Sequence, residues 1–418
     1  MFLAGLFDSI LDRTIRSRLP KRFLKSQSTF QQTIHEILAS KGEVSSRRHA
    51  EKLLAMIDSF DKKQLKAFFD HLSENLEIDT IALSKAAAGF AEDVSSDNLL
   101  KVRNASDSRR LELFRRLASS NQGIIRLVKL REKLISLMKE IPNNRKIDTD
   151  LRYLFKEWFN KGFLVLKPIN WTTPANILEK IIEYEAVHEI KSWKELRERL
   201  DPADRRCFAF FHPVMEDEPL IFVEVALMRD VPTRICDVLE EIRDEINPEK
   251  TNTAVFYSIS NCQRGLQGIS FGNFLIKSVV QSLQIEFSNI KQFVTLSPVP
   301  GFRKWARKRT NELASNIDLN SDLQTDRDLE MLLRDYFFNS ERSDKQPNDP
   351  VARFHLGNGA SLHQINLNGD ASKKGINDSW GIMVNYKYTL KDLEKNHESY
   401  QNKNQLNYSN ILKKWASS

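Results

Sequence analysis

Cysteine is scarce in this sequence. The three cysteines, Cys207, Cys236 and Cys262, form no CxxC pair, and no histidine follows them at the spacing of a zinc site. The sequence therefore predicts neither a structural metal nor a disulfide framework, and it favours a reducing compartment.

Long apolar runs are also missing. The longest, Leu220 to Met228, contains Glu224 and falls far short of the roughly 20 residues that a membrane span needs. The first residues are partly apolar, but Asp8 and Asp12 interrupt them and no basic residue precedes them, which is untypical of a secretory signal. We therefore expect a soluble, cytoplasmic protein with no membrane partner and no organelle targeting.

Positive charge is in modest excess, with a net charge of +7. Such an excess would suit a polyanion, but basic residues stand among acidic ones, as in Lys129 to Lys133 and Lys191 to Arg199. That mixture is typical of solvated helix faces. We therefore expect no nucleic-acid partner.

The first part of the chain has the apolar spacing of a helical bundle. Between Glu51 and Ile141, apolar residues recur with the period of one helix face. Stripes of this kind pack into a core more often than they bind a partner, so we interpret them as packing. The stripes consist of Leu53, Leu54, Ile57 and Phe60; Leu65, Phe68, Phe69 and Leu72; and Ile124, Leu127, Leu130 and Leu134.

A change of pattern near Lys161 predicts a second domain. The turn signal from Ile141 to Asn144 is followed by one more amphipathic helix, Asp148 to Phe159, and then by Gly162. A chain of 418 residues is also longer than one typical domain. We expect an α+β two-domain protein, with an all-α helical bundle over residues 1–161 and a second domain over residues 162–418.

Short runs of β-branched and aromatic residues alternate with helical segments in the second domain. This alternation predicts a mixed α/β sheet domain. The predicted strands are Cys207 to Phe211, Leu220 to Met228, Thr253 to Ser258, Phe293 to Leu296, Leu362 to Leu367 and Ile382 to Tyr388, and the predicted helices are Ala175 to Glu185, Arg234 to Ile246 and Gly272 to Phe287.

Three glycines, Gly265, Gly268 and Gly272, lie between a predicted strand and the helix that follows it. Glycine lets backbone amides approach a ligand, and a helix N-terminus adds unpaired N–H groups, so this layout suits a phosphate group such as the pyrophosphate of coenzyme A. The spacing matches neither GxGxxG nor the P-loop. A tight turn would explain the same glycines equally well.

The motif LSPVPGF, residues 296–302, places Ser297 at the end of a predicted strand. Its prolines and glycine fix the backbone at the carboxyl edge of the sheet, where α/β domains often bind ligands. A rigid turn whose serine caps backbone groups is the simpler interpretation of a Ser-Pro pair. The sequence is expected to contain no GxSxG elbow, so a serine hydrolase gets no support.

His355 lies in the motif DPVARFHLGNGASLHQIN, between Phe354 and Leu356 and shortly before Gly357 and Gly359. In a partly apolar site beside flexible backbone, a histidine could titrate near neutral pH and transfer a proton. A single histidine of this kind more often has a structural role. The residues alone thus indicate a two-domain protein with a candidate phosphate-ligand site.

These motifs resemble, in the same order, those of the malonyl-CoA decarboxylase family. The resemblance rests on the GLQG loop with the LIK helix, on LSPVPGF with Lys304 and Trp305, on NDPVARFHLGNGA and on GIMVNYKY. LFKEWFNKGFLVL, INWTTPANIL, EAVHEIKSW and HPVMEDEPLIFVEVAL are similar to the family as well. Together they cover most of the chain from about Leu151 to Tyr388.

Membership would imply a fold, a reaction and partners. The family pairs an N-terminal helical domain that helps subunits associate with a catalytic domain of GNAT-type acyltransferase fold, in which coenzyme A lies across splayed central strands. It converts malonyl-CoA to acetyl-CoA and carbon dioxide, a lyase reaction of fatty acid metabolism. The resemblance thus implies malonyl-CoA and acetyl-CoA as ligands, no metal, no cofactor beyond the CoA moiety, and a homo-oligomer, either a dimer or a tetramer.

The resemblance also assigns site residues. The catalytic serine and histidine of the family correspond to Ser297 and His355, and a tyrosine associated with the site corresponds to Tyr388. Where the family carries a glutamate after GLQG and one apolar residue, this chain has Ser270, so that carboxylate is missing here. The malonyl-CoA loop corresponds to Gln267, Gly268, Ile269, Ser270, Phe271, Gly272 and Asn273.

Two further features fit a bacterial cytoplasmic enzyme. The segment between Trp305 and Pro350 looks shorter than in animal members of the family. The last residues, Trp415 to Ser418, lack the SKL peroxisomal signal.

Loss of carbon dioxide leaves electrons on the carbon next to the thioester, so an enolate must be stabilised and protonated. We expect His355 to donate a proton toward this enolate and Ser297 to hydrogen-bond the malonyl carboxylate or carbonyl. Two alternatives would use the same CoA loop. A GNAT-type N-acetyltransferase would release CoA only when an amine is present, and a non-catalytic acyl-CoA-binding protein would bind without turnover.

Overall fold

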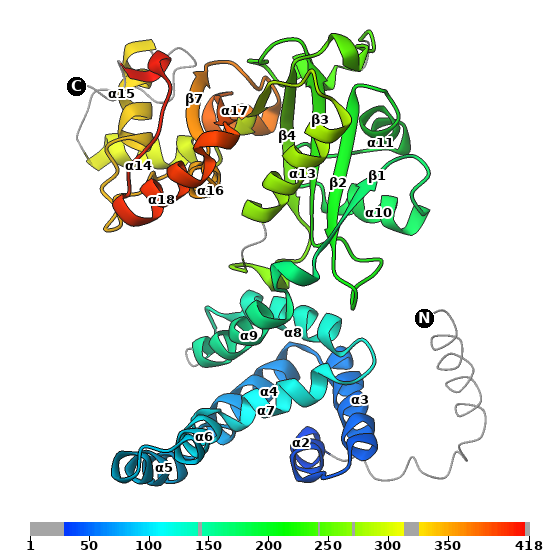
Figure 1. The fold of residues 1–418 in the computed structure, drawn as a ribbon, viewed down its shortest axis with the longest axis vertical. Coiled ribbons are helices and arrows are strands. Elements are labelled where there is room, and N and C mark those ends of the chain that lie inside the picture. Colours follow the sequence, from blue (N-terminus) through cyan, green and yellow to red (C-terminus); the bar gives the residue numbers. More distant parts are fainter. Residues whose placement is uncertain (1–28, 141–143, 241–242, 270–271, 313–325, 414–418) are drawn as a thin grey trace. The chain divides into compact units, whose positions relative to one another are not determined.

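The computed structural model describes residues 29–140, 144–240, 243–269, 272–312 and 326–413. The chain forms two compact units, Met1–Leu154 and Phe155–Ser418 (Figure 1). The expected domain boundary, between residues 161 and 162, falls shortly after this division.

The first unit is helical along most of its described length. Several of its helices begin at a side chain that accepts a hydrogen bond from a free N–H of the first turn. At the start of α4, for example, Asp61 and Gln64 form a reciprocal capping box. The helices are α2 (Phe30–Ala39), α3 (Glu43–Ser59), α4 (Lys62–Asn75), α5 (Thr80–Glu92), α6 (Ser96–Ser106), α7 (Arg109–Ala118), α8 (Gly123–Leu137) and the first part of α9 (Asn144–Trp158).

The predicted apolar stripes form the core of this unit. All of their residues are buried except Phe60 and Ile124, which are half-buried. The interpretation of the stripes as packing surfaces is therefore confirmed. Helices α5 and α6 differ, because neither has a buried residue and both expose apolar side chains such as Ile81 and Leu100.

The second unit is built on an eight-stranded mixed sheet with the order β1-β2-β3-β4-β5-β8-β6, in which β7 also pairs with β8. Its strand pairs are antiparallel except β4 and β5, which run parallel. This sheet and the helical first unit confirm the α+β prediction. The strands are β1 (Val165–Ile169), β2 (Arg205–Phe211), β3 (Ile221–Met228), β4 (Thr253–Asn261), β5 (Gln292–Thr295), β6 (Ser297–Pro298), β7 (Ser361–Asn366) and β8 (Met383–Tyr388).

Helices pack on both faces of this sheet. The Phe274 ring of α13 stacks on Phe210 of β2, whereas Ile177 of α10 packs with Ala209 and Phe211, which point to the opposite face. Figure 1 shows α13 crossing the sheet and α10 and α11 beside β1 and β2. The helices are α10 (Ala175–Tyr184), α11 (Trp193–Leu200), α12 (Cys236–Leu239), α13 (Gly272–Glu286), α14 (Phe302–Glu312), α15 (Asp326–Phe337), α16 (Pro350–Gly357), α17 (Lys373–Ser379) and α18 (Leu393–Lys403).

The predicted helix over Arg234 to Ile246 is wrong. Only α12 is helical there, and residues 241–242 lie outside the described part of the chain. The Arg243 guanidinium and the Ile246 N–H both bond the Asp204 carboxylate, at 2.6 and 3.2 Å. These tertiary bonds hold the segment in a non-helical course that an amphipathic pattern cannot reveal.

The parallel strands β4 and β5 separate beyond Phe256. Residues 253–256 of β4 pair with residues 292–295 of β5, but β4 continues to Asn261 while the chain after Thr295 enters β6 and pairs with β8. The central strands therefore splay, as the GNAT-type fold implies. A cavity lies at this opening, lined by the end of β4 and by β6.

Candidate active site

Ser297 is the first residue of β6, just past the end of β5. It is buried, and its register partner is Val384 of β8. Its Oγ donates to Oγ1 of Thr295 at 2.9 Å, since residues two apart on an extended chain face the same side. The serine thus lies at the carboxyl end of β5, where it was predicted.

His355 lies on α16 and is buried. The helix begins after Asp349, whose carboxylate accepts from the Ala352 N–H at 2.6 Å. The histidine sits inside a capped helix that ends at Gly357, and Gly359 follows with φ of 85°. Nε2 of His355 lies 3.2 Å from Oγ of Ser297.

Tyr388 reaches the other side of the imidazole. It is on β8, opposite Phe293 of β5, and its hydroxyl lies 2.7 Å from Nδ1 of His355. Ser297 is 58 residues and Tyr388 is 33 residues from the histidine in sequence. The fold thus brings the three residues into one hydrogen-bonded series, which we call the Ser-His-Tyr chain.

The sequence analysis does not predict two further residues of the site, Thr295 and Tyr386. Thr295 Oγ1 accepts from Ser297 and from the Tyr386 N–H at 3.1 Å. The Tyr386 ring stacks on His355, with centroids 4.6 Å apart and planes 24° apart. Each lies two residues before a predicted site residue, Thr295 before Ser297 and Tyr386 before Tyr388, so the alternation of extended backbone was the signal that could have found them.

Burial determines the charge of the site. Desolvation lowers the pKa of His355 to about 3, so the expectation that it titrates near neutral pH is wrong. Burial raises the pKa of Tyr388 well above its ordinary value, which keeps the hydroxyl protonated. We therefore assign Tyr388 as the donor to Nδ1, which leaves the imidazole hydrogen on Nε2, facing Ser297.

A cavity of about 240 Å³ opens beside Ser297 and His355. Its walls come from β4, β6, α16 and Val187, which follows α10. Among the described residues that line it, none carries a charge at neutral pH, because the imidazole is neutral. The lining residues are Val187, Phe256, Tyr257, Ile259, Asn261, Ser297, Pro298, Pro350, Val351, Phe354 and His355.

The predicted CoA loop follows β4, whose last residue lines this cavity. Residues 267 and 268 form a turn in which Gly268 has φ of 81°, a conformation that favours glycine. Ser270 and Phe271 lie outside the described residues, and Gly272 is the first residue of α13. The described loop residues do not line the cavity, so the CoA contact of this loop stays a prediction.

Residues 268–272 also read GISFG, which matches the GxSxG pattern of hydrolases. A hydrolase elbow joins a strand directly to a helix. Here the short 3₁₀ helix Arg264–Leu266 stands between β4 and this segment. The pattern therefore lacks the structural context of a nucleophile elbow.

Within the described residues, no group of three or more His, Cys, Asp or Glu side chains is arranged to hold a metal ion. None of the described helices combines the length and the apolar character that crossing a membrane requires. The three cysteines are free, and only Cys236 is exposed.

The structure defines a class of protein in which a helical unit precedes a mixed sheet whose central strands splay beside a buried Ser-His-Tyr chain. Two family models match the chain, the malonyl-CoA decarboxylase N-terminal domain over residues 76–159 and the C-terminal domain over residues 162–327 and 318–417. The chain belongs to the malonyl-CoA decarboxylase family.

Solved and curated relatives agree with this assignment. The crystal structure of malonyl-CoA decarboxylase from Agrobacterium vitis is 44% identical, with a TM-score of 0.87 over 94% of this chain and 100% of that chain. The enzyme from Rhodopseudomonas palustris is also 44% identical, with a TM-score of 0.84 over 92% of this chain and 98% of that chain. The mitochondrial malonyl-CoA decarboxylase of Anser anser anser is 35% identical over 342 residues, 72% of this chain and 68% of that protein.

Proposed function

We propose that this protein decarboxylates malonyl-CoA to acetyl-CoA and carbon dioxide. The observation that carries the proposal is the Ser-His-Tyr chain, which ends on an uncharged cavity between splayed strands. Membership of the family supports the same reaction.

The lining of the cavity favours the loss of carbon dioxide. The malonyl carboxylate concentrates its charge on two oxygens, whereas the transition state spreads that charge toward the thioester. Phe256, Ile259 and Phe354 offer the carboxylate no compensating charge. The transition state, whose charge is more dispersed, therefore loses less solvation free energy than the carboxylate does when both leave water. The thioester carbonyl is itself the acceptor of the electron pair.

Ser297 is proposed to stabilise the enolate oxygen. Its hydroxyl donates to Thr295 in the structure, and a bound thioester oxygen would replace Thr295 as the acceptor. A positioned donor at a developing oxyanion is typically worth about 100- to 1000-fold in rate.

His355 is proposed to protonate the enolate carbon. As the hydrogen on Nε2 passes to carbon, Nδ1 takes the hydroxyl proton of Tyr388, so the imidazole stays neutral. The carbon–carbon bond has then broken, carbon dioxide has left, and a new C–H bond has formed. Tyr388 regains its proton from water. The transfer is downhill because an enolate carbon is a far stronger base than a phenolate.

The CoA moiety is proposed to follow β4 toward the loop at residues 267–273. Asn261 ends β4 and lines the cavity, so a thioester beside Ser297 leads along this strand to the loop. There the N-terminus of α13 would receive phosphate groups.

We also propose a homo-oligomer, a dimer or a tetramer, that forms through α5 and α6. Neither helix has a buried residue, although α5 is rich in alanine and other apolar residues. Ile81 is 82% exposed and Leu100 is 55% exposed. Apolar helix faces left open in this way are typical of subunit contacts.

The decisive test is to incubate the purified protein with malonyl-CoA, without added metal or amine, and to follow acetyl-CoA and carbon dioxide. Wild type should form both in equal amounts, and His355→Asn should form neither while it still binds acetyl-CoA. His363→Asn is the matched control, since His363 lies on β7 and does not line the cavity. Tight binding without product would contradict the proposal and favour an acyl-CoA-binding protein.

A further inference from the structure

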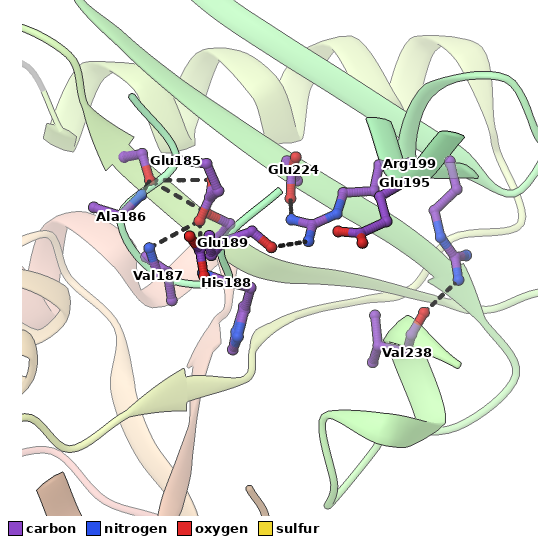
Figure 2. A network of polar contacts seen from close by, with 12 residues as sticks. Glu185, Ala186, Val187, His188, Glu189, Glu195, Arg199, Glu224 and Val238 are labelled. Atoms are coloured by element: carbon purple, nitrogen blue, oxygen red, sulfur yellow. Dashed lines mark hydrogen bonds and ion pairs between the residues drawn. The ribbon is translucent and has the colours of Figure 1, made fainter. Parts of the chain in front are cut away.

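The four residues Glu185 to His188 are here called the wall segment, and Figure 2 shows them among the polar contacts around Glu185. Val187 lines the catalytic cavity together with Phe256 and Tyr257 of β4. Val187 and His188 also border a separate cavity of about 800 Å³. The wall segment therefore separates two cavities, and its position limits the width of the catalytic one.

Glu185 fastens the wall segment to β4. Its carboxylate oxygens accept from Oγ of Ser258 at 2.8 and 2.7 Å and from Oγ of Ser260 at 3.2 Å. Oε1 also accepts from the N–H groups of Val187 and His188, both at 2.8 Å. The carboxylate is buried, so these bonds compensate for its lost hydration and hold the backbone in one place.

Lys374 of α17 holds the same segment from the other side. Its Nζ donates to the carbonyl oxygens of Ala186 and Val187, at 2.7 and 3.1 Å. The N–H of Val187 is thus bonded to Glu185 and its carbonyl to Lys374. Val187 therefore has little freedom to move away from the catalytic cavity.

We infer that Val187 is a specificity-determining residue, which admits an unbranched malonyl group and excludes malonyl groups that carry a substituent on the α-carbon. The inference rests on the proposed function. The cavity of about 240 Å³ must hold the acyl end beside Ser297 and His355. A methyl group on the α-carbon that points toward Val187 would meet a wall whose backbone is bonded to both Glu185 and Lys374. Apolar pockets distinguish one such group by about 10- to 200-fold.

Glu185 and Lys374 are positioning residues in this scheme, because they act through Val187. Glu185→Gln replaces one of the two acceptor oxygens by an NH2 group, which donates and cannot accept from a serine or a backbone N–H. Lys374→Met keeps the apolar stem but removes both bonds to the wall carbonyls. Each change should loosen the wall and weaken discrimination.

The test compares kcat/KM for malonyl-CoA and for methylmalonyl-CoA. In Val187→Ala, kcat/KM for methylmalonyl-CoA divided by kcat/KM for malonyl-CoA should rise about 10-fold, because the substitution removes two methyl groups from the cavity lining. Val231→Ala is the matched control, because Val231 is a half-buried valine that packs on the sheet and does not line the cavity. An unchanged ratio in Val187→Ala would overturn the inference.

The variants of Glu185 and Lys374 are tested by the same ratio of kcat/KM values as well as by Tm. Glu185→Gln and Lys374→Met should raise the same ratio, and Lys374→Arg should restore it. A lower Tm with an unchanged ratio would show that both residues are merely structural and would remove them from the scheme.

A protein without decarboxylase activity can be distinguished from one in which Val187 has no role in specificity. If wild type turned over neither ester, decarboxylation would be excluded, and the wall would be tested by calorimetric titration with acetyl-CoA and propionyl-CoA. Val187→Ala should then bind propionyl-CoA more tightly relative to acetyl-CoA. Equal relative affinities in the variant and wild type would overturn the role of Val187.

Discussion

Nδ1 of His355 lies 2.7 Å from the hydroxyl oxygen of Tyr388, so a strand residue orients an imidazole that a helix carries. Two residues earlier on the same strand, Tyr386 stacks on the face of that ring. β8 therefore fixes the imidazole both in its plane and from one side. The geometry of the site therefore depends on how α16 packs against β8.

Tyr388→Phe should lower kcat by about 100-fold, because it removes the proton source behind the imidazole. Affinity for acetyl-CoA should stay close to that of wild type, since the tyrosine lies behind His355. Steady-state kinetics and calorimetric titration measure the two quantities. Tyr400→Phe is the matched control, because the Tyr400 hydroxyl has no hydrogen-bond partner in the described structure. Equal losses of kcat and of CoA affinity would instead indicate a structural tyrosine.

Thr295→Val should lower the free energy of unfolding by about 1–3 kcal/mol, since it leaves the buried Tyr386 N–H without its acceptor. Thr295→Ser keeps the hydroxyl and loses one methyl group, which costs about 0.8 kcal/mol. Urea unfolding of both variants measures the difference. If both variants lost the same stability, the hydroxyl would have no structural role.

The stability of the protein should depend on His355 below neutral pH. The pKa of His355 is about 3 in the folded chain and 6.5 ordinarily, so in between only the unfolded chain takes up the proton. This residue therefore lowers the free energy of unfolding as pH falls from 6.5 toward 3. His355→Gln should flatten that fall in urea titrations at several pH values. A variant with the slope of wild type would contradict the buried, neutral histidine.

Asp349 should change the free energy of unfolding in the opposite direction over the same pH range. Burial raises the pKa of Asp349 to about 7 from 3.8, so between these values the folded chain holds a proton that the unfolded chain releases. Its contribution to stability is therefore lost as pH rises from 3.8 to 7. Asp349→Asn keeps a residue suited to capping α16 and should remove this dependence. The same urea titrations measure it, and an unchanged slope would refute the shift.

The double variant Ile81→Asp, Leu100→Asp should dissociate the proposed oligomer, because it places charge on both exposed apolar helices. Light scattering after size exclusion measures the mass, and circular dichroism should show unchanged helix content. The matched control is Val214→Asp, an exposed valine of the second unit. A wild type that is already monomeric, or a double variant with unchanged mass, would exclude this contact.

Local patterns predict much of the fold. The apolar stripes at Leu53 and Phe68 predict buried helix faces, because one face of each helix must leave water. The run Leu220 to Met228 predicts β3, which is buried on both sides of the sheet. β1 has no such signal, since Val165 is exposed and only Ile169 of that strand is buried. It becomes a strand through pairing with β2.

The sequence by itself determined the family and the order of the two domains, and it predicted Ser297, His355 and Tyr388 as site residues, because motifs and periodicity are local properties. Only the tertiary structure decided that these three side chains form one hydrogen-bonded series, that Thr295 and Tyr386 join them, and that Glu185 and Lys374 hold Val187 at the cavity. Its packing also buries His355, which lowers the pKa of the imidazole. Burial and contacts between distant residues set these features, and neither exists until the chain has packed.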